Sequence, residues 1–283
     1  MDPCTRAALP GLVAALLLIA EAGPAQGGAR ARVELLSAAP AVRPGQPLLL
    51  GLRVTVEPRW HTYWRNPGDA GMAPRISWDL PDGFAIREVE WPYPKRFEEE
   101  GIATFGYEGA PTLLATLVPP QDLAGTTAAT VGVRVDLLVC REVCVPDGGE
   151  ARLTLPVAAG GGVGAEPAWL TAARAAIPAV PARWTFRARQ EGQRITLSIV
   201  PPDDSPLKNE PPVFFPQTRD LLDYTARAGY RRVNAGAELD LHLSALAMGI
   251  PSRLEGVLVP ANGADALAVN VPIEREGKIE LSP

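Results

Sequence analysis

The sequence predicts an all-β protein with two β-sandwich domains that a short, helix-containing linker joins. Three observations predict this fold class. Short runs of alternating apolar and polar residues recur along most of the chain, and glycine- and proline-rich turn clusters separate them. One stretch between the two strand-rich regions has helical periodicity instead. The length of 283 residues accommodates two domains with cores of their own.

Residues 1–22 are predicted to be a cleavable signal peptide. Arg6 precedes the apolar run Leu9–Ala20, and Ala20-Glu21-Ala22 offers small residues at the spacing of a cleavage site. The run is shorter than the about 20 apolar residues that cross a membrane. An uncleaved anchor and a lipoprotein are the alternatives, but Cys4 precedes the apolar run, whereas a lipid-modified cysteine would follow it. We therefore expect an exported protein without stable membrane insertion.

The charge of the chain bears on its partners. The formal net charge is −5, and it becomes −4 once residues 1–22 are removed, because they carry Asp2, Glu21 and Arg6. A mildly acidic chain without basic clusters is a poor ligand for nucleic acid. No nucleic-acid partner is expected.

The first domain, residues 30–157, is predicted to be a β-sandwich. Turn clusters such as Arg43-Pro44-Gly45-Gln46 and Asn66-Pro67-Gly68-Asp69 divide it into short runs. Eight strands are predicted there: Arg32–Leu36, Leu48–Glu57, Trp60–Arg65, Arg75–Leu80, Ile86–Trp91, Thr112–Val118, Val131–Val139 and Ala151–Val157.

Residues 158–182 are predicted to be a linker that carries one docking helix. Ala158–Gly164 is a glycine-rich break, and Glu166–Ile177 then places Trp169, Leu170, Ala173 and Ile177 on one helical face. The second domain, residues 183–283, is predicted to be a smaller β-sandwich interrupted by the proline-rich loop Pro201–Pro212. Its predicted strands are Trp184–Arg189, Arg194–Val200, Tyr230–Asn234, Glu238–Ala245, Ser252–Val259 and Leu267–Ile273.

Cys140 and Cys144 are the only cysteines left once the signal peptide is removed. In an extended strand, Cα atoms four positions apart lie roughly 13 Å from each other, whereas a disulfide requires about 4.4 to 6.8 Å. If the two cysteines pair, the residues Arg141–Val143 must turn. Pro146-Asp147-Gly148-Gly149 indicates a second turn before the strand Ala151–Val157. The sequence therefore predicts a dithiol at a bend between strands.

Two uses of this pair are possible in an exported protein. An isolated pair is usually a structural disulfide, but a bridge across so short a loop stabilises a fold little. Thiol–disulfide exchange is the better use of the pair. Arg141 is the nearby base, while Asp136, Glu142, Asp147 and the run Glu98-Glu99-Glu100 are acidic. If those acids lie close, they raise the cysteine pKa, and the site is expected to react slowly until a partner binds.

The segment Trp60–Arg65 is the second unusual stretch. As a strand it places His61, Tyr63 and Arg65 on one face and Trp60, Thr62 and Trp64 on the other. His61 and Tyr63 either line the dithiol as a hydrogen-bonding or proton-relay pair, or belong to a packed aromatic strand.

A metal site is a further alternative. Cys140, Cys144 and His61 could form a soft-ligand copper site, and Cys-x-x-x-Cys-x-Pro has a loose similarity to copper-delivery proteins. Those proteins have βαβ patterns, which this sequence lacks. We therefore expect neither a metal nor another cofactor.

Four segments carry a resemblance to a known family. In their order along the chain, they resemble the N-terminal periplasmic domain of DsbD-type thiol:disulfide interchange proteins, in particular the ScsB-like branch with its Cys-x-x-x-Cys pair. The resemblance covers about residues 33–157 and, less distinctly, the second sandwich. The segments are Trp60–Asp69, Trp91–Phe97, Phe105–Glu108 and Leu138–Pro146.

The resemblance implies a fold and an activity. The domain would be an immunoglobulin-like sandwich in the periplasm that shuttles electrons to thioredoxin-like partners, among them isomerases and cytochrome c maturation factors. Cys140 and Cys144 match the redox pair, and Cys144 matches the cysteine that forms mixed disulfides. His61 and Tyr63 match aromatic positions beside the cysteines. Phe97, Glu98 and Glu99 fall in the segment Phe97–Gly101, near the cap loop that covers the disulfide until a partner displaces it.

The chain ends after the second sandwich, without the family's membrane and thioredoxin-like domains. We therefore expect a separate DsbD-like membrane protein to donate electrons. The alternative is a non-enzymatic periplasmic interaction module in which Cys140 and Cys144 form a structural disulfide.

Overall fold

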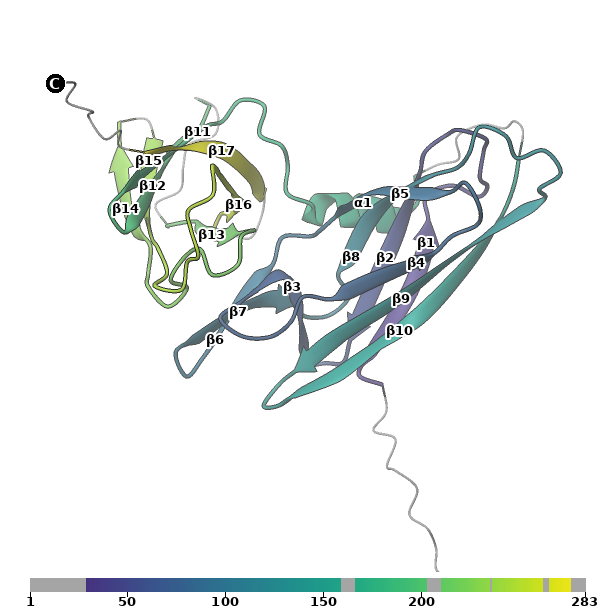
Figure 1. Cartoon of the computed structure of the whole chain (residues 1–283), viewed down its shortest axis with the longest axis horizontal. Helices are drawn as coiled ribbons and strands as arrows, with labels where there is room; N and C mark the ends of the chain where they lie inside the picture. The colour runs from purple at the N-terminus through teal and green to yellow at the C-terminus, as the bar shows by residue number, and fades with distance from the viewer. Residues whose placement is uncertain (1–28, 159–165, 203–209, 235, 262–264, 276–283) are drawn as a thin grey trace, which may run out of the picture.

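The computed structural model describes residues 29–158, 166–202, 210–234, 236–261 and 265–275. The predicted signal peptide and nearly all of the predicted glycine-rich break lie outside these ranges. No helix in the described ranges is long and apolar enough to cross a membrane. The regular elements of the described chain are strands and one helix, so the predicted all-β fold is confirmed (Figure 1).

Two sheets of the first domain enclose a common core (Figure 1). Side chains alternate along the strands, so that Leu52, Val54, Val133, Val135 and Leu137 are buried between the sheets. One sheet pairs, in order, β1 (Ala31–Ser37), β2 (Leu48–Val56), β8 (Thr112–Val118) and β5 (Ala85–Glu90). The other pairs β10 (Cys144–Pro156), β9 (Ala128–Cys140), β3 (His61–Gly68), β7 (Ile102–Tyr107) and β6 (Lys95–Glu99), and β4 (Arg75–Asp79) also pairs with β9.

Strands β9 and β10 form a long hairpin and pair along all thirteen residues of each strand. The predicted turn at Pro146-Asp147-Gly148-Gly149 is wrong, because these residues lie inside β10. Asp147 holds this part of the strand, since its Oδ2 accepts hydrogen bonds from the backbone N–H groups of Arg30 and Ala31 at 2.6 and 3.2 Å. Gly148 has a φ of +148°, and a Cβ there would clash with the backbone of β9. Tertiary pairing thus overrides the local turn signal.

Strands β6 and β7 form a second hairpin, Lys95–Tyr107, which we call the cap hairpin. The sequence does not predict it. Glu100 and Gly101 connect the strands and have φ values of 50° and 80°, which is the pattern of a two-residue type I′ loop. A Glu-Gly pair lacks the asparagine or aspartate that usually indicates this turn, and consecutive glutamates disfavour strands.

Helix α1 (Ala168–Ala176) docks on the first domain. Its buried residues Leu170 and Ala173 pack against Leu114 of β8. The ring of Trp169 lies over Gly51 of β2, where any added Cβ would clash with it. The helix is shorter than the predicted segment Glu166–Ile177. All four predicted face residues, Trp169, Leu170, Ala173 and Ile177, belong to this cluster.

In its described residues, the second domain has seven strands that enclose one core (Figure 1). Antiparallel pairs build it, except that β11 and β17 are parallel. The sequence does not predict the short strand β13, which follows the proline-rich loop. The order in the sheet is β13 (Val213–Pro216), β16 (Arg253–Val259), β17 (Leu267–Arg275), β11 (Thr185–Glu191), β12 (Arg194–Val200), β15 (Gly236–His242) and β14 (Gly229–Val233).

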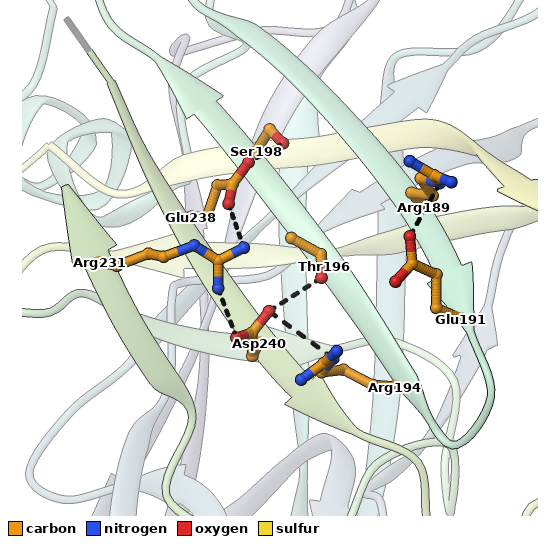
Figure 2. A network of polar contacts seen from close by, with 8 residues as sticks. All are labelled: Arg189, Glu191, Arg194, Thr196, Ser198, Arg231, Glu238 and Asp240. Carbon is orange, nitrogen blue, oxygen red and sulfur yellow. Dashed lines mark hydrogen bonds and ion pairs between the residues drawn. The ribbon is translucent and has the colours of Figure 1, made fainter. Parts of the chain in front are cut away.

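A polar network covers the outer face of β12, β15 and β14 (Figure 2). Arg231 pairs with both Glu238 and Asp240, and its Nη1 lies 2.8 Å from Asp240 Oδ2. The Thr196 hydroxyl donates to Asp240 Oδ1 at 2.8 Å. Exposed ion pairs contribute at most about 1 kcal/mol each. The network therefore marks the solvent face of this sheet, while alternate residues such as Leu197 and Leu239 are buried on the other face.

One aromatic core joins the two domains. Trp64 on β3 and Phe105 on β7 are buried against Phe215 on β13, with ring centroids 6.4 and 5.0 Å apart and edge-to-face geometry. Tyr224, also in the second domain, meets Phe105 at 4.9 Å. Contacts between domains of one chain are usually more polar than this. The shared core therefore fixes the second domain on the end of the first that carries β3 and β7 (Figure 1).

A double-mutant cycle tests this shared core. Trp64→Leu and Phe215→Leu each remove one ring of a buried edge-to-face pair, and we expect a coupling free energy of about 0.5–1.5 kcal/mol in denaturant unfolding. Trp64→Leu combined with Leu155→Ala is the control, because Leu155 lies in a separate core cluster. Additivity of the first pair within about 0.3–0.5 kcal/mol, as expected for the control pair, would contradict the joined core.

Candidate functional site

The two cysteines lie opposite each other at the end of the β9–β10 hairpin and form a disulfide. Cys140 ends β9, Cys144 begins β10, and their Cα atoms are 4.1 Å apart. Arg141–Val143 form the bend between them, in which the Arg141 N–H donates to the Val143 carbonyl at 3.3 Å. The two sulfur atoms differ in access, because Cys140 is 3% exposed whereas Cys144 is exposed at the surface.

Strand β3 lies beside the bridge. His61 pairs with Cys140 in the sheet, and the hydroxyl of Thr62 donates to the Leu138 carbonyl at 2.9 Å, which fixes the two strands side by side. The hydroxyl of Tyr63 lies 2.9 Å from Cys140 Sγ and 3.3 Å from Cys144 Sγ. Disulfide sulfurs carry no hydrogen, so the tyrosine is the donor. Burial raises the pKa of Tyr63, which keeps its proton in place at neutral pH.

His61 lies between Tyr63 and the cap hairpin. Its ring stacks on Phe97 with centroids 4.5 Å apart and meets Tyr63 edge-on at 5.6 Å. Burial lowers the pKa of His61, and this outweighs the opposite effect of Glu108 and Glu99. At neutral pH the imidazole is therefore uncharged. Its Nε2 is buried and has no hydrogen-bond partner among the described residues.

An open groove surrounds the bridge, with a volume of about 730 Å³. It brings together every candidate site residue: Cys140, Cys144, His61, Tyr63, Phe97, Glu98 and Glu99 all line it. Glu100, Glu108 and Glu142 line it too, beside the two bases Arg59 and Arg141. The rim is thus mainly acidic, with Phe97 and the exposed Ile102 supplying apolar surface.

Two of the acidic residues expected near the cysteines, Asp136 and Asp147, do not line the groove. Asp136 accepts a hydrogen bond from Arg134 at 3.1 Å, and Asp147 binds backbone N–H groups of the N-terminal strand. Arg141 has its guanidinium 5.4 Å from the Trp60 ring and pairs with Glu142 at 3.7 Å. The acidity of the groove therefore comes largely from the cap hairpin rather than from the sequence neighbours of the cysteines.

The expected alternation of β3 holds only as far as Tyr63. Trp60 is buried in the core of the first domain, but Trp64 belongs to the core shared with the second domain. Arg65, expected on the face of His61 and Tyr63, instead has its guanidinium carbon 5.8 and 5.6 Å from the ring centroids of Trp64 and Trp91. Burial lowers the pKa of Arg65. The reason is an irregularity between Tyr63 and Gly68 in the pairing of β3 with β7.

Sequence reasoning missed Thr62, Glu108 and Arg59. Thr62 had no signal in the local sequence, because its hydroxyl binds the Leu138 carbonyl, a backbone group 76 positions away. Glu108 is the last residue of the segment Phe105–Glu108, which the sequence singles out without assigning it to the site. Within the described parts of the chain, no three histidine, cysteine or acidic side chains converge to hold a metal ion.

The comparisons with known proteins concern both fold and family. The crystal structure of the N-terminal periplasmic domain of ScsB from Proteus mirabilis matches with a TM-score of 0.58 and 20% identity, over 87% of this chain and 92% of that one. The tandem immunoglobulin domains A164-A165 of titin match with a TM-score of 0.18 and 10% identity, over 87% and 99% of the two chains. No curated protein sequence matches at a significant level.

The ScsB structure shares the fold of this chain, which confirms the fold expected from the resemblance. The family described as the N-terminal domain of thiol:disulfide interchange protein DsbD matches residues 32–156. This range contains all of β1 except its first residue, the strands β2 to β10, both cysteines, Tyr63 and the cap hairpin. Residues 32–156 of this chain therefore match the family of DsbD N-terminal domains, which is a family of thiol:disulfide interchange modules.

Proposed function

We propose that the chain is a periplasmic electron carrier that passes reducing equivalents between thioredoxin-like proteins through Cys140 and Cys144. The observation that carries the proposal is the unequal access of the two sulfurs. Cys144 is exposed in an open groove, whereas Cys140 is buried beside the Tyr63 hydroxyl. Exchange requires one sulfur that a partner can reach and a second that resolves the mixed disulfide.

The exchange step follows from this arrangement. In the reduced protein, the Cys144 thiolate attacks one sulfur of a partner disulfide, and the other partner sulfur leaves as a thiolate. Cys140, as a thiolate, then attacks the Cys144 sulfur and releases the second partner thiolate. The partner gains two electrons, and the Cys140–Cys144 bridge forms. Tyr63 can donate its hydrogen bond to either sulfur, and such a bond stabilises a thiolate more than a neutral thiol.

The alternative, a structural disulfide in an interaction module, has less support. The bridge closes a loop of sequence separation four at the tip of a hairpin that already pairs along thirteen residues. Loop-closure entropy is small for so short a loop, and the hairpin does not depend on it for register. The bridge therefore stabilises little, and its groove position is better explained by exchange.

The cap hairpin would regulate access. Phe97 stacks on His61, and Glu98 and Glu99 line the groove beside the bridge. In the proposal a thioredoxin-like partner displaces this hairpin tip when it docks. A separate membrane protein of the DsbD type is the proposed donor of electrons, and periplasmic isomerases or cytochrome c maturation factors are proposed acceptors.

Single cysteine variants test the carrier role. Cys140→Ser leaves the exposed Cys144 without its resolving partner, so we expect it to accumulate a one-to-one mixed disulfide with a thioredoxin-like protein, visible on a non-reducing gel. Cys144→Ser is the matched control and should form little adduct, because Cys140 is buried. A lack of adduct with both variants, together with a wild-type bridge that thioredoxin-like donors do not reduce, would favour the structural disulfide.

Phe97→Ala tests the cap. Loss of the ring that stacks on His61 should speed reduction of the bridge by dithiothreitol roughly threefold to tenfold, since an aromatic ring pair contributes about 0.5–1.5 kcal/mol. It should also raise the pKa of His61 toward the ordinary value of about 6.5, because the imidazole becomes hydrated. NMR titration of the histidine signals measures this shift. Arg96→Ala, next to Phe97 on β6, is the control; equal rates for wild type and Phe97→Ala would rule out shielding by the ring.

A further inference from the structure

A buried amide connects the second domain to the strand that carries Tyr63. Asn66 on β3 is fully buried, and its Nδ2 donates to the Pro216 carbonyl at 2.8 Å and to the Tyr224 hydroxyl at 3.0 Å. A longer contact of 3.4 Å reaches the Thr218 carbonyl. These three acceptors belong to the second domain. The Oδ1 of the same side chain accepts the N–H of Gly68 at 3.1 Å, so both domains are held by one amide.

Asn66 lies within a segment that leaves the sheet. Strand β3 pairs with β7 at Tyr63, opposite Gly106, and again at Gly68, opposite Thr104. The residues 64–67 therefore face a single residue of β7 and loop out of the ladder; we call them the β3 excursion. A bulge of this kind re-aims the side chains at its ends. Here it turns the Trp64 ring against Phe215 of the second domain.

The excursion is also anchored where it returns to the first domain. Gly68 has a φ of +86° and lies so close to the Ala103 backbone that a Cβ would clash. The backbone N–H of the next residue, Asp69, donates to the Ala103 carbonyl at 2.9 Å, and its side-chain Oδ2 accepts the Ala103 N–H at 2.8 Å. Gly71 then lies against the ring of Tyr63, where an added Cβ would again clash. The chain just after the excursion thus packs on the ring whose hydroxyl contacts the disulfide.

We propose that Asn66 is a positioning residue for thiol exchange. By binding the second domain, it fixes the β3 excursion and thereby holds the Tyr63 hydroxyl against the sulfurs of Cys140 and Cys144. The role of the second domain is then to preorganise the redox site through its contacts with β3 rather than to contact the exchange partner. This inference rests on the proposed exchange function, because it assigns a determinant of that same site.

Displacement of Tyr63 should shift the redox equilibrium of the bridge in one direction. A hydrogen bond to a thiolate is stronger than one to a neutral sulfur. If Tyr63 moves away, the reduced, thiolate-containing form loses more hydrogen-bond stabilisation than the disulfide does. The equilibrium of the bridge with a dithiol should then shift toward the disulfide.

The test measures the equilibrium constant of the bridge against dithiothreitol in the full chain. We expect Asn66→Ala to shift it toward the disulfide by roughly threefold or more, within the range known for residues that couple separated sites. Tyr63→Phe should produce a similar shift, and the double variant should show no further change, since both act through one hydroxyl. Tyr224→Phe keeps the ring but removes one acceptor of the amide, and a smaller shift in the same direction is expected.

Leu155→Ala is the control for lost stability alone, because Leu155 lies in a core cluster separate from the interdomain core. It should lower the unfolding midpoint and leave the redox equilibrium unchanged. If Asn66→Ala does not fold, Tyr224→Phe and its double variant with Tyr63→Phe decide the question. An unchanged equilibrium in the folded variants, or shifts that add to that of Tyr63→Phe, would overturn the positioning role.

The measurement separates this inference from the exchange function. Equilibration with dithiothreitol needs no protein partner, so it reports on Tyr63 even if Cys140→Ser traps no thioredoxin-like protein. Failure of trapping with a shifted equilibrium would count against the carrier role alone. Successful trapping with an unchanged equilibrium would count against the role of Asn66 alone.

Discussion

The register between β9 and β10 is the constraint on which the site depends. Thirteen consecutive pairs end with Cys144 opposite Cys140, and the pairing of β9 with β3 places His61 opposite the same cysteine. A slip of one residue would turn every side chain of a strand to the other face. The apolar face of β9 prevents such a slip, because Val133, Val135 and Leu137 must stay in the core. Burial far from the bridge thus sets the geometry at the bridge.

A second constraint arises from the aromatic core between the domains. Trp64 and Phe105 are large apolar side chains at the edge of the first sandwich, and Phe215 covers them. Such side chains would be unfavourable in water. The second domain therefore completes the burial of the first. The strand that supplies Trp64 to this core supplies Tyr63 to the disulfide, one residue earlier. One short segment of β3 therefore contributes both to the contact between the domains and to the geometry at the sulfurs.

The sequence predicts the fold class, most strands, the bend at Cys140–Cys144 and the residues that gather around it, because these depend on local patterns and motif resemblance. It does not predict the cap hairpin, whose Glu100-Gly101 loop has a weak turn signal. It places a turn at Pro146–Gly149, where pairing with β9 imposes a strand. It also continues the alternation of β3 past Tyr63. That error follows from contacts of Trp64 and Asn66 with residues about 150 positions later, which no local pattern reveals.

The burial of Cys140 beneath Tyr63 has a kinetic consequence. With one reachable sulfur in one groove, a donor and an acceptor cannot occupy the protein together. The proposed carrier would therefore work by a ping-pong scheme, in which each partner leaves before the next arrives and no ternary complex forms. Excess donor would then compete with the acceptor for the same surface. Throughput would then depend on the ratio of the two partners, so their relative abundance in the cell becomes a control on electron flow.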